Sequence, residues 1–123
     1  MALLAAVAGC GVPPEVEVAC SDLQQTFTDE LFTPVISKTC VSCHNPDGVA
    51  QATRMVYPVG ITAAEAYPIF RKMAQVKSQG EPLVLLKPSG QMSHAGGTVF
   101  AKDSMTYAQF ESVVSGMSRC GTQ

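Results

Sequence analysis

The chain of 123 residues has no tryptophan, only two histidines, and few charged residues, which make up 15% of it. Its net charge is −2 and its charges are scattered, which excludes the basic footprint of a nucleic-acid-binding protein. Hydrophobic residues make up 46%, a composition typical of globular proteins rather than disordered ones. No nucleophile stands in an arrangement with a general base. We therefore expect one small globular domain without hydrolase or transferase chemistry.

One short stretch concentrates the chemistry of the chain. Cys40-Val41-Ser42-Cys43-His44 forms a C-x-x-C-H pattern, which is typical of covalent attachment of a c-type haem. Two thiols three residues apart on one helical turn can each form a thioether with a haem vinyl group. The imidazole of His44 follows directly and can reach the iron as its proximal axial ligand. The motif predicts one covalently attached haem c, which would also give a small domain a large apolar centre.

Three other interpretations of this motif are open. A redox-active C-x-x-C pair belongs in a thioredoxin-like βαβ context, and no strand-rich pattern precedes Cys40. A zinc site needs a second close pair of ligands, whereas the other cysteines and His94 are isolated in the sequence. The third interpretation is chance, in a chain with five cysteines. The haem interpretation agrees best with the rest of the chain.

The N-terminus has features of an export signal. Residues 1–9 are almost wholly apolar but too short to cross a membrane, and Val7-Ala8-Gly9-Cys10 resembles the lipobox of bacterial lipoproteins. In that resemblance the signal is cleaved before Cys10, which then carries the lipid; an ordinary secretory signal is the alternative. Residues 10–19 follow as a tether, and 20–123 as the folded domain. Both export routes lead to an oxidising compartment of the cell envelope.

These assignments leave two cysteines that can form a disulfide. If Cys10 is lipidated and Cys40 and Cys43 hold haem, two of the five cysteines remain. Cys20 and Cys120 lie near opposite ends of the domain, and we expect a disulfide between them, with two unpaired buried thiols as the alternative. In the chain-entropy account, a disulfide that closes a loop of about 100 residues stabilises by roughly 4.7 kcal/mol.

Hydrophobic periodicity and capping residues predict an all-α domain of about four short helices. Pro34, with Thr33 as its N-cap, is expected to begin a new helix after a kink. Thr62 and Glu65 fit a capping box, and Ser104 fits the N-cap of the last helix. The predicted helices cover 22–31, 34 through the haem motif, the capping box to about 74, 82–86, and 105–117, with a turn over 78–81.

The connecting loops also carry signals. Asn45-Pro46-Asp47-Gly48 predicts a turn that ends the motif helix directly after the iron ligand. The loop over 49–60 could wrap a haem edge, where Arg54 or Tyr57 could reach a propionate. A solvated arginine and a packed tyrosine are equally good interpretations of those two residues.

Together these features resemble the cytochrome c family, through a helix before the motif, a mid-chain helix and a C-terminal helix. The resemblance is narrower to small c-type domains of bacterial envelope proteins. Three stretches carry it within residues 21–120, namely Leu83-Val84-Leu85-Leu86-Lys87-Pro88, Ser93-His94-Ala95-Gly96-Gly97 and Asp103-Ser104-Met105-Thr106-Tyr107. It implies a small cytochrome c-like fold in which the first and last helices cross beside the haem. Many members carry a Met-Pro distal loop, and here no methionine precedes a proline.

The resemblance places the distal axial ligand about fifty residues after the proximal one. His94 lies there, in a glycine-rich loop, and is the only other histidine of the chain. Met92 in the same loop is the alternative ligand. Met105 and Met117 lie on predicted apolar helix faces, where methionine usually fills a core. An open distal site is the last alternative.

The expected function is one-electron transfer by a lipid-anchored monohaem cytochrome with two axial histidines, and not enzymatic catalysis. Two alternatives stand beside it: a haem enzyme or gas sensor with an open or displaceable distal site, and a structural haem subunit of a larger electron-transfer complex. The expected partners are redox proteins of the bacterial cell envelope and the membrane itself, on the periplasmic or outer surface. No nucleic acid is expected as a partner.

Overall fold

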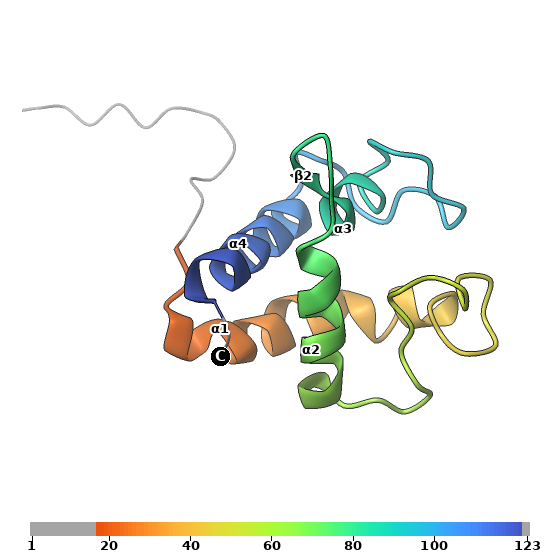
Figure 1. Cartoon of the computed structure of the whole chain (residues 1–123), viewed down its shortest axis with the longest axis horizontal. Helices are drawn as coiled ribbons and strands as arrows, with labels where there is room; N and C mark the ends of the chain where they lie inside the picture. Colours follow the sequence, from red (N-terminus) through yellow and green to blue (C-terminus); the bar gives the residue numbers. More distant parts are fainter. Residues whose placement is uncertain (1–16, 122–123) are drawn as a thin grey trace, which may run out of the picture.

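The computed structural model describes residues 17–121, and most of its ordered elements are helices (Figure 1). The signal segment 1–9, the lipidation residue Cys10 and most of the tether lie outside the described residues. In the part described, no helix is both long and apolar enough to span a membrane. The elements in chain order are η1 (Cys20–Asp22), α1 (Leu23–Thr26), η2 (Phe27–Ile36), η3 (Cys40–Ser42), α2 (Ala63–Ala74), β1 (Lys77–Ser78), β2 (Glu81–Pro82), α3 (Leu83–Leu86) and α4 (Met105–Cys120).

The first helical segment differs from its prediction. The short 3-10 helix η1, α1 and the π-helix η2 follow one another without a break, so Pro34 lies inside a helix and does not begin one. In an α-helix a proline ring clashes with the carbonyl four residues before it, and a wider turn relieves that clash. The N–H of Ser37 donates to the carbonyl of Phe32, five residues earlier. The helix ends at Ile36, so the prediction that it continues through the haem motif is wrong.

The core is built where the first segment, α2 and α4 meet (Figure 1). Phe27 of η2 is fully buried and contacts the rings of Tyr67 and Phe70 on α2, at centroid distances of 5.3 and 5.4 Å. Phe70 in turn contacts Phe110 of α4 at 5.9 Å. These edge and tilted ring contacts join three elements that are distant in sequence, and they agree with the expected packing of the first and last helices.

The other helices begin close to where the caps predict. The Thr62 hydroxyl accepts from the Glu65 N–H while the Glu65 carboxylate accepts from the Thr62 N–H, which confirms the capping box of α2. The Ser104 hydroxyl accepts from the N–H of Tyr107 at 3.1 Å, which confirms the N-cap of α4. That helix continues to Cys120, three residues further than predicted.

A two-stranded hairpin separates α2 from α3, so the prediction of a purely α-helical domain is wrong in this one place. Strands β1 and β2 pair antiparallel around Gln79 and Gly80. Both turn residues have positive φ, 53° and 82°, which is the backbone of a tight hairpin turn. The predicted turn over 78–81 is therefore present, and α3 follows as the predicted short helix.

Candidate functional site

The C-x-x-C-H motif lies on a short 3-10 turn and the residues after it. Cys40 begins η3 and packs against the buried core, while Cys43 and His44 directly follow that helix and are half-buried. The N–H of His44 donates to the carbonyl of Cys40 at 2.9 Å. This bond keeps the two thiols and the imidazole on one turn of chain, as the motif predicts.

The loop after the motif folds back and forms hydrogen bonds with His44. Asn45 forms the predicted turn, since its side-chain oxygen accepts from the Asp47 N–H and its carbonyl accepts from the Gly48 N–H. The N–H of Tyr57 donates to the carbonyl of His44 at 2.8 Å. The segment from His44 to Tyr57 is thus a closed loop whose two ends are joined by a backbone hydrogen bond.

The same loop fixes the ring of His44 and its tautomer. Nδ1 of His44 lies 2.8 Å from the carbonyl oxygen of Met55 and 3.3 Å from the Thr53 hydroxyl. A carbonyl oxygen can only accept, so Nδ1 carries the proton and Nε2 keeps a bare lone pair. Burial lowers the pKa of His44 below its usual value, and the nearby charges of His94 and Lys87 lower it further. The hydrogen bond to the Met55 carbonyl raises this pKa, but by less than burial lowers it. A neutral ring with a free Nε2 is the form that binds a metal.

His94 lies on a loop that is tied down at its base. The carbonyl of Pro88 accepts from the N–H groups of Val99 and Phe100, which closes the loop between α3 and α4. Inside it, the buried Ser89 hydroxyl donates to the Leu85 carbonyl and accepts from the side chain of Gln91. In Figure 1 this loop (cyan) and the loop after η3 (yellow) lie at the same end of the molecule.

The ring of His94 is held in the same way as that of His44. Its Nδ1 lies 2.9 Å from the carbonyl oxygen of Gly97, and the N–H of Gly97 donates back to the His94 carbonyl at 2.9 Å. Gly97 has φ +75°, a conformation that favours glycine at the end of this turn. The carbonyl again assigns the proton to Nδ1 and leaves Nε2 free. Among residues 17–121, neither Nε2 atom has a hydrogen-bond partner.

The two imidazole rings lie close together as a near-parallel, stacked pair. Their centroids are 6.3 Å apart and their planes differ by 17°. A metal–imidazole bond is about 2.0 Å long, and the ring centre lies about 1.1 Å behind the nitrogen because ring bonds are about 1.33 Å. One metal ion with two axial imidazoles would therefore separate the ring centres by about 6.2 Å. The observed distance between the ring centres is close to this value.

The methionine candidates take other places. Met92 lines, together with His94, a cavity of about 370 Å³ formed by the loop over 90–98. Met105 is 60% exposed, so its predicted inward position on the last helix is wrong; it occupies the first position of α4. Met117 is almost fully buried in the core, as predicted for core filling. Of the two candidates on this loop, His94 forms a ring pair with His44.

The surroundings of the motif differ from those of the competing site types. Burial raises the pKa of the Cys40 thiol to about 11, and the Cys43 thiol adds to the rise. Redox-active C-x-x-C pairs instead have a lowered pKa at the attacking cysteine. Within residues 17–121, no three His, Cys, Asp or Glu side chains gather into a metal-binding cluster. A haem iron needs only two ligands from side chains, because the porphyrin supplies the other four.

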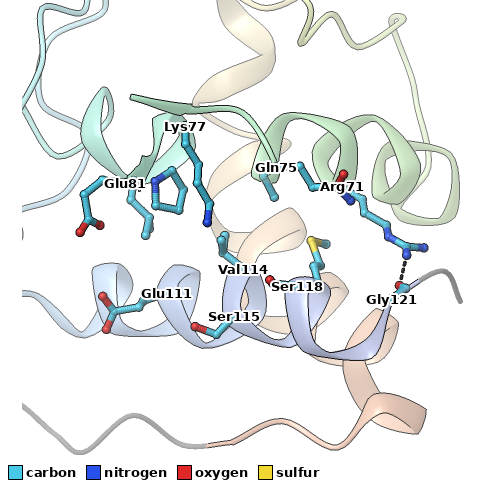
Figure 2. A pocket seen from close by; sticks show the side chains of 13 residues that line it. Arg71, Gln75, Lys77, Glu81, Glu111, Val114, Ser115, Ser118 and Gly121 are labelled. Carbon is cyan, nitrogen blue, oxygen red and sulfur yellow. Dashed lines mark hydrogen bonds between the residues drawn. The ribbon is translucent and has the colours of Figure 1, made fainter. Parts of the chain in front are cut away.

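A second cavity of about 610 Å³ lies away from the motif, between α2, the hairpin and α4 (Figure 2). Lys77 points from the hairpin toward α4, and Glu81 and Glu111 lie near one end (Figure 2). At the other end the guanidinium of Arg71 donates to the carbonyl of Gly121. No residue of the motif or of the His94 loop lines this cavity, so it is separate from the histidine pair.

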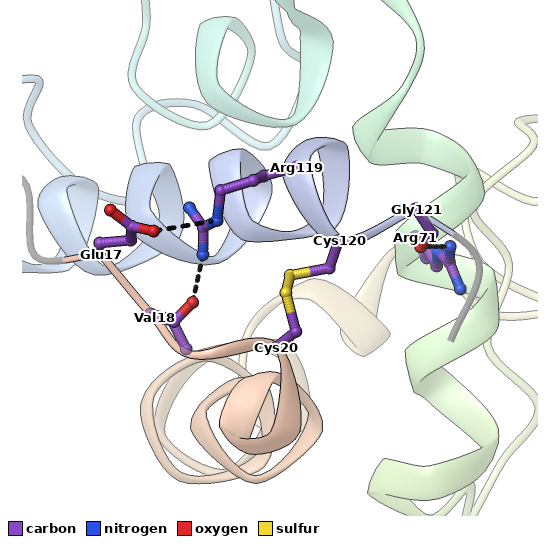
Figure 3. The surroundings of a disulfide bond; sticks show 7 residues. All are labelled: Glu17, Val18, Cys20, Arg71, Arg119, Cys120 and Gly121. Atoms are coloured by element: carbon purple, nitrogen blue, oxygen red, sulfur yellow. Dashed lines mark hydrogen bonds and ion pairs between the residues drawn. A yellow bond between two sulfur atoms is a disulfide. The ribbon is translucent and has the colours of Figure 1, made fainter.

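The predicted pairing of Cys20 with Cys120 is present (Figure 3). Their Cα atoms are 5.6 Å apart, within the usual range for a disulfide. Beside it, Arg119 forms an ion pair with Glu17 at 3.4 Å and donates to the carbonyl of Val18. The bridge joins the start of the first helical segment to the end of α4.

Two groups that hold the histidines were not predicted. They are the backbone carbonyls of Met55 and Gly97. Every residue has a backbone carbonyl, so the residue type does not indicate which one accepts a hydrogen bond. The glycine pair at 96–97 was the only signal near either of them, and it indicates a turn rather than an acceptor.

No family model matches the chain, and no curated protein or solved structure matches it significantly.

Proposed function

We propose that this chain is a monohaem c-type cytochrome that carries single electrons, with His44 and His94 as axial ligands. The close pair of imidazole rings supports this most strongly. One member belongs to a C-x-x-C-H motif, both rings keep a free Nε2, and the ring centres are 6.3 Å apart. Cys40 and Cys43 would hold the haem through thioethers. When bound, the haem iron supplies the chemistry by cycling between its ferric and ferrous states.

The residues around the site have distinct tasks in this proposal. The Met55 and Gly97 carbonyls orient the two rings and fix their tautomers, which also raises the basicity of each ligand nitrogen. Two imidazole ligands, from His44 and His94, would leave no position on the iron open and would so favour electron transfer over substrate binding. Compared with a His/Met pair, two histidines should give a lower reduction potential.

The test is near-infrared magnetic circular dichroism of the ferric protein, with wild type beside His94→Ala and Met92→Leu. We expect a bis-imidazole signature in wild type and Met92→Leu, and its loss in His94→Ala. A His/Met signature that persists in His94→Ala would contradict the assignment of His94. A purified protein without the absorption bands of covalent haem would contradict the whole proposal.

A haem enzyme or gas sensor is the second candidate, and one observation favours it. His94 lies beside a cavity of about 370 Å³, and the residues after it, Ala95 to Thr98, are exposed. A ligand on such a loop is easier to displace than one on a packed helix. Carbon monoxide added to the ferrous protein separates the two: rapid binding supports a displaceable His94, and no binding supports the electron carrier.

We propose further that the domain is held on the bacterial envelope by a lipid at Cys10. The Cys20–Cys120 disulfide supports an oxidising compartment. Cys10→Ser should move the protein from the membrane fraction to the soluble fraction and abolish labelling with fatty acid. Gel filtration of the detergent-extracted protein would show whether it is a separate electron carrier that serves redox partners or a subunit of a larger electron-transfer complex.

A further inference from the structure

Ser89 is a buried polar residue at the start of the loop that carries His94. It is 8% exposed, whereas Gly90 and Gln91 directly after it are exposed. Buried hydroxyls are nearly always paired in native proteins, and this one has two partners. It donates to the carbonyl of Leu85 and accepts from the side-chain amide of Gln91 at 2.7 Å. Ser89 therefore joins the end of α3 to the first residues of the loop over 90–98.

The end of α3 is fixed in the core. Val84 and Leu85 are 5% and 3% exposed and belong to the buried core cluster. The carbonyl of Leu86, the last residue of α3, accepts from the N–H groups of Gln91 and Met92 at 3.0 and 3.1 Å. The backbone bonds and the Ser89 side chain thus hold the start of the loop at the same place.

The rest of the loop has few hydrogen bonds. Within residues 17–121, the hydrogen bonds of residues 93–98 join His94 to Gly97 and reach no other part of the chain. The next bond along the chain is the Val99 N–H donating to the Pro88 carbonyl at 2.7 Å. Hydrogen bonds therefore hold the position of His94 only through the two ends of its loop.

The two ends of this loop also lie against each other. Gly90 has φ +77°, and a β-carbon on it would lie 2.5 Å from the hydroxyl oxygen of Thr98. Gly90 directly follows Ser89, so a displacement of the chain at Ser89 would reach Thr98. The contacts of Ser89 thus bear on both ends of the loop.

We propose that Ser89, together with Gln91, is a positioning residue for His94 and sets how readily a small neutral molecule replaces His94 on the iron. This rests on the proposed function, because it takes His94 as the distal ligand. In the exchange, Nε2 of His94 leaves with its lone pair and the small molecule donates its own, so the iron keeps its oxidation state. With both contacts of Ser89 intact, His94 stays in place and electron transfer is favoured over ligand binding.

The test compares Ser89→Ala and Gln91→Ala with Ser93→Ala in the full, haem-loaded chain. Ser89→Ala removes both contacts of the hydroxyl. Gln91→Ala removes one of them from an exposed position, so it keeps the test open if Ser89→Ala does not fold. Ser93→Ala is the matched control, because Ser93 is exposed, stands next to His94 and forms no hydrogen bond within residues 17–121.

The first measurement is the rate of carbon monoxide binding to the ferrous protein. At saturating carbon monoxide this rate equals the rate at which His94 leaves. We expect Ser89→Ala to raise it about 5- to 10-fold, the effect of one ordinary hydrogen bond, and Gln91→Ala to raise it by a smaller factor. Ser93→Ala should bind at the wild-type rate. If neither Ser89→Ala nor Gln91→Ala binds faster than Ser93→Ala, the role of Ser89 is overturned.

Amide hydrogen exchange separates a loosened loop from a general loss of stability. In Ser89→Ala the amides of Gln91, Met92 and Val99, whose bonds fix the ends of the loop, should exchange faster. The amide of Phe110 in α4 should keep its wild-type protection, and equal acceleration there would mean a merely structural role and overturn the proposal. Wild type without covalent haem would overturn the proposed function, while the exchange rates would still decide whether Ser89 holds the loop.

Discussion

Gly48 approaches the carbonyl of Cys43 so closely that a β-carbon on it would lie 2.1 Å from that oxygen. The same carbonyl accepts from the N–H of Ala50 at 3.0 Å. Backbone atoms cannot move aside as a flexible side chain does, so Gly48→Ala must displace the turn and with it Cys43. We expect a loss of about 1–3 kcal/mol in the free energy of unfolding, the usual cost of overpacking, and less haem attached per chain.

Urea unfolding and the absorbance of attached haem measure these two effects. Ala52→Ser is the matched control, because Ala52 is exposed on the same loop and surface substitutions change stability by less than about 0.5 kcal/mol. If Gly48→Ala unfolds at the same urea concentration as this control, the close approach between Gly48 and Cys43 is wrong.

The disulfide predicts a large change in stability. Cys20 and Cys120 are separated by 100 positions, and loss of a native disulfide from a small secreted domain costs roughly 2–5 kcal/mol. The double variant with serine at both positions should lose stability within this range while its α2 capping box still forms. Chemical unfolding with and without reducing agent measures the loss. A wild-type midpoint that does not respond to reduction would show that the bridge is absent in solution.

The sequence predicts most helices of this fold because each has a local signal at its start. The capping box of Thr62 and Glu65 marks the start of α2, and Ser104 marks the start of α4. The structure has both caps at the predicted positions. The prediction that Pro34 begins a helix is wrong for a physical reason. Proline is favoured in the first turn of a helix, but a widened helix tolerates it further along. The hairpin beside Gln79 is only two residues long on each strand, too short for any periodicity to show.

The side chains of the candidate site could be predicted from the sequence, but the backbone groups that hold them in place could not. The C-x-x-C-H motif is defined by residue type, and His94 is the only other histidine, so both could be named in advance. The closeness of their rings depends on how two loops close, through the Tyr57 N–H donating to the His44 carbonyl and the Val99 N–H donating to the Pro88 carbonyl. Such backbone bonds depend on the folded path of the chain rather than on any single residue.

The half-buried, neutral His44 makes the stability of the unloaded chain depend on pH. Burial lowers its folded-state pKa below the usual 6.5, so the unfolded chain takes up a proton first as the pH falls. Its contribution is fully present above about pH 6.5 and is lost as the pH falls through the folded-state pKa. His44→Gln should therefore reduce the loss of stability between about pH 7.5 and pH 5.

Urea unfolding of the unloaded chain at several pH values measures this slope. His94→Gln is the matched control, since it removes the other imidazole of the pair but leaves His44 and its Met55 bond in place. It should retain most of the slope, because burial rather than the His94 charge is the main cause of the lowered pKa. A steep slope that persists in His44→Gln would mean that another group titrates with unfolding.

Leu23 and Gly116 mark the crossing of α1 and α4, and their contact predicts a coupled pair of mutations. A β-carbon on Gly116 would lie 2.7 Å from Cδ1 of Leu23, which is only 2% exposed. Gly116→Ala alone gains about 1 kcal/mol of helix propensity but overpacks a buried contact, at a cost of about 1–3 kcal/mol. We expect a net loss of stability from this single variant.

The sign should reverse once the leucine is removed. Leu23→Ala leaves a cavity and costs about 2–5 kcal/mol, and in that background the methyl of Gly116→Ala enters free space and adds its helix propensity. The double variant should then be more stable than Leu23→Ala alone. Urea unfolding of the four proteins completes a double-mutant cycle with a coupling energy of about 1–3 kcal/mol between these positions. Additive effects would mean that α1 and α4 do not cross at this contact.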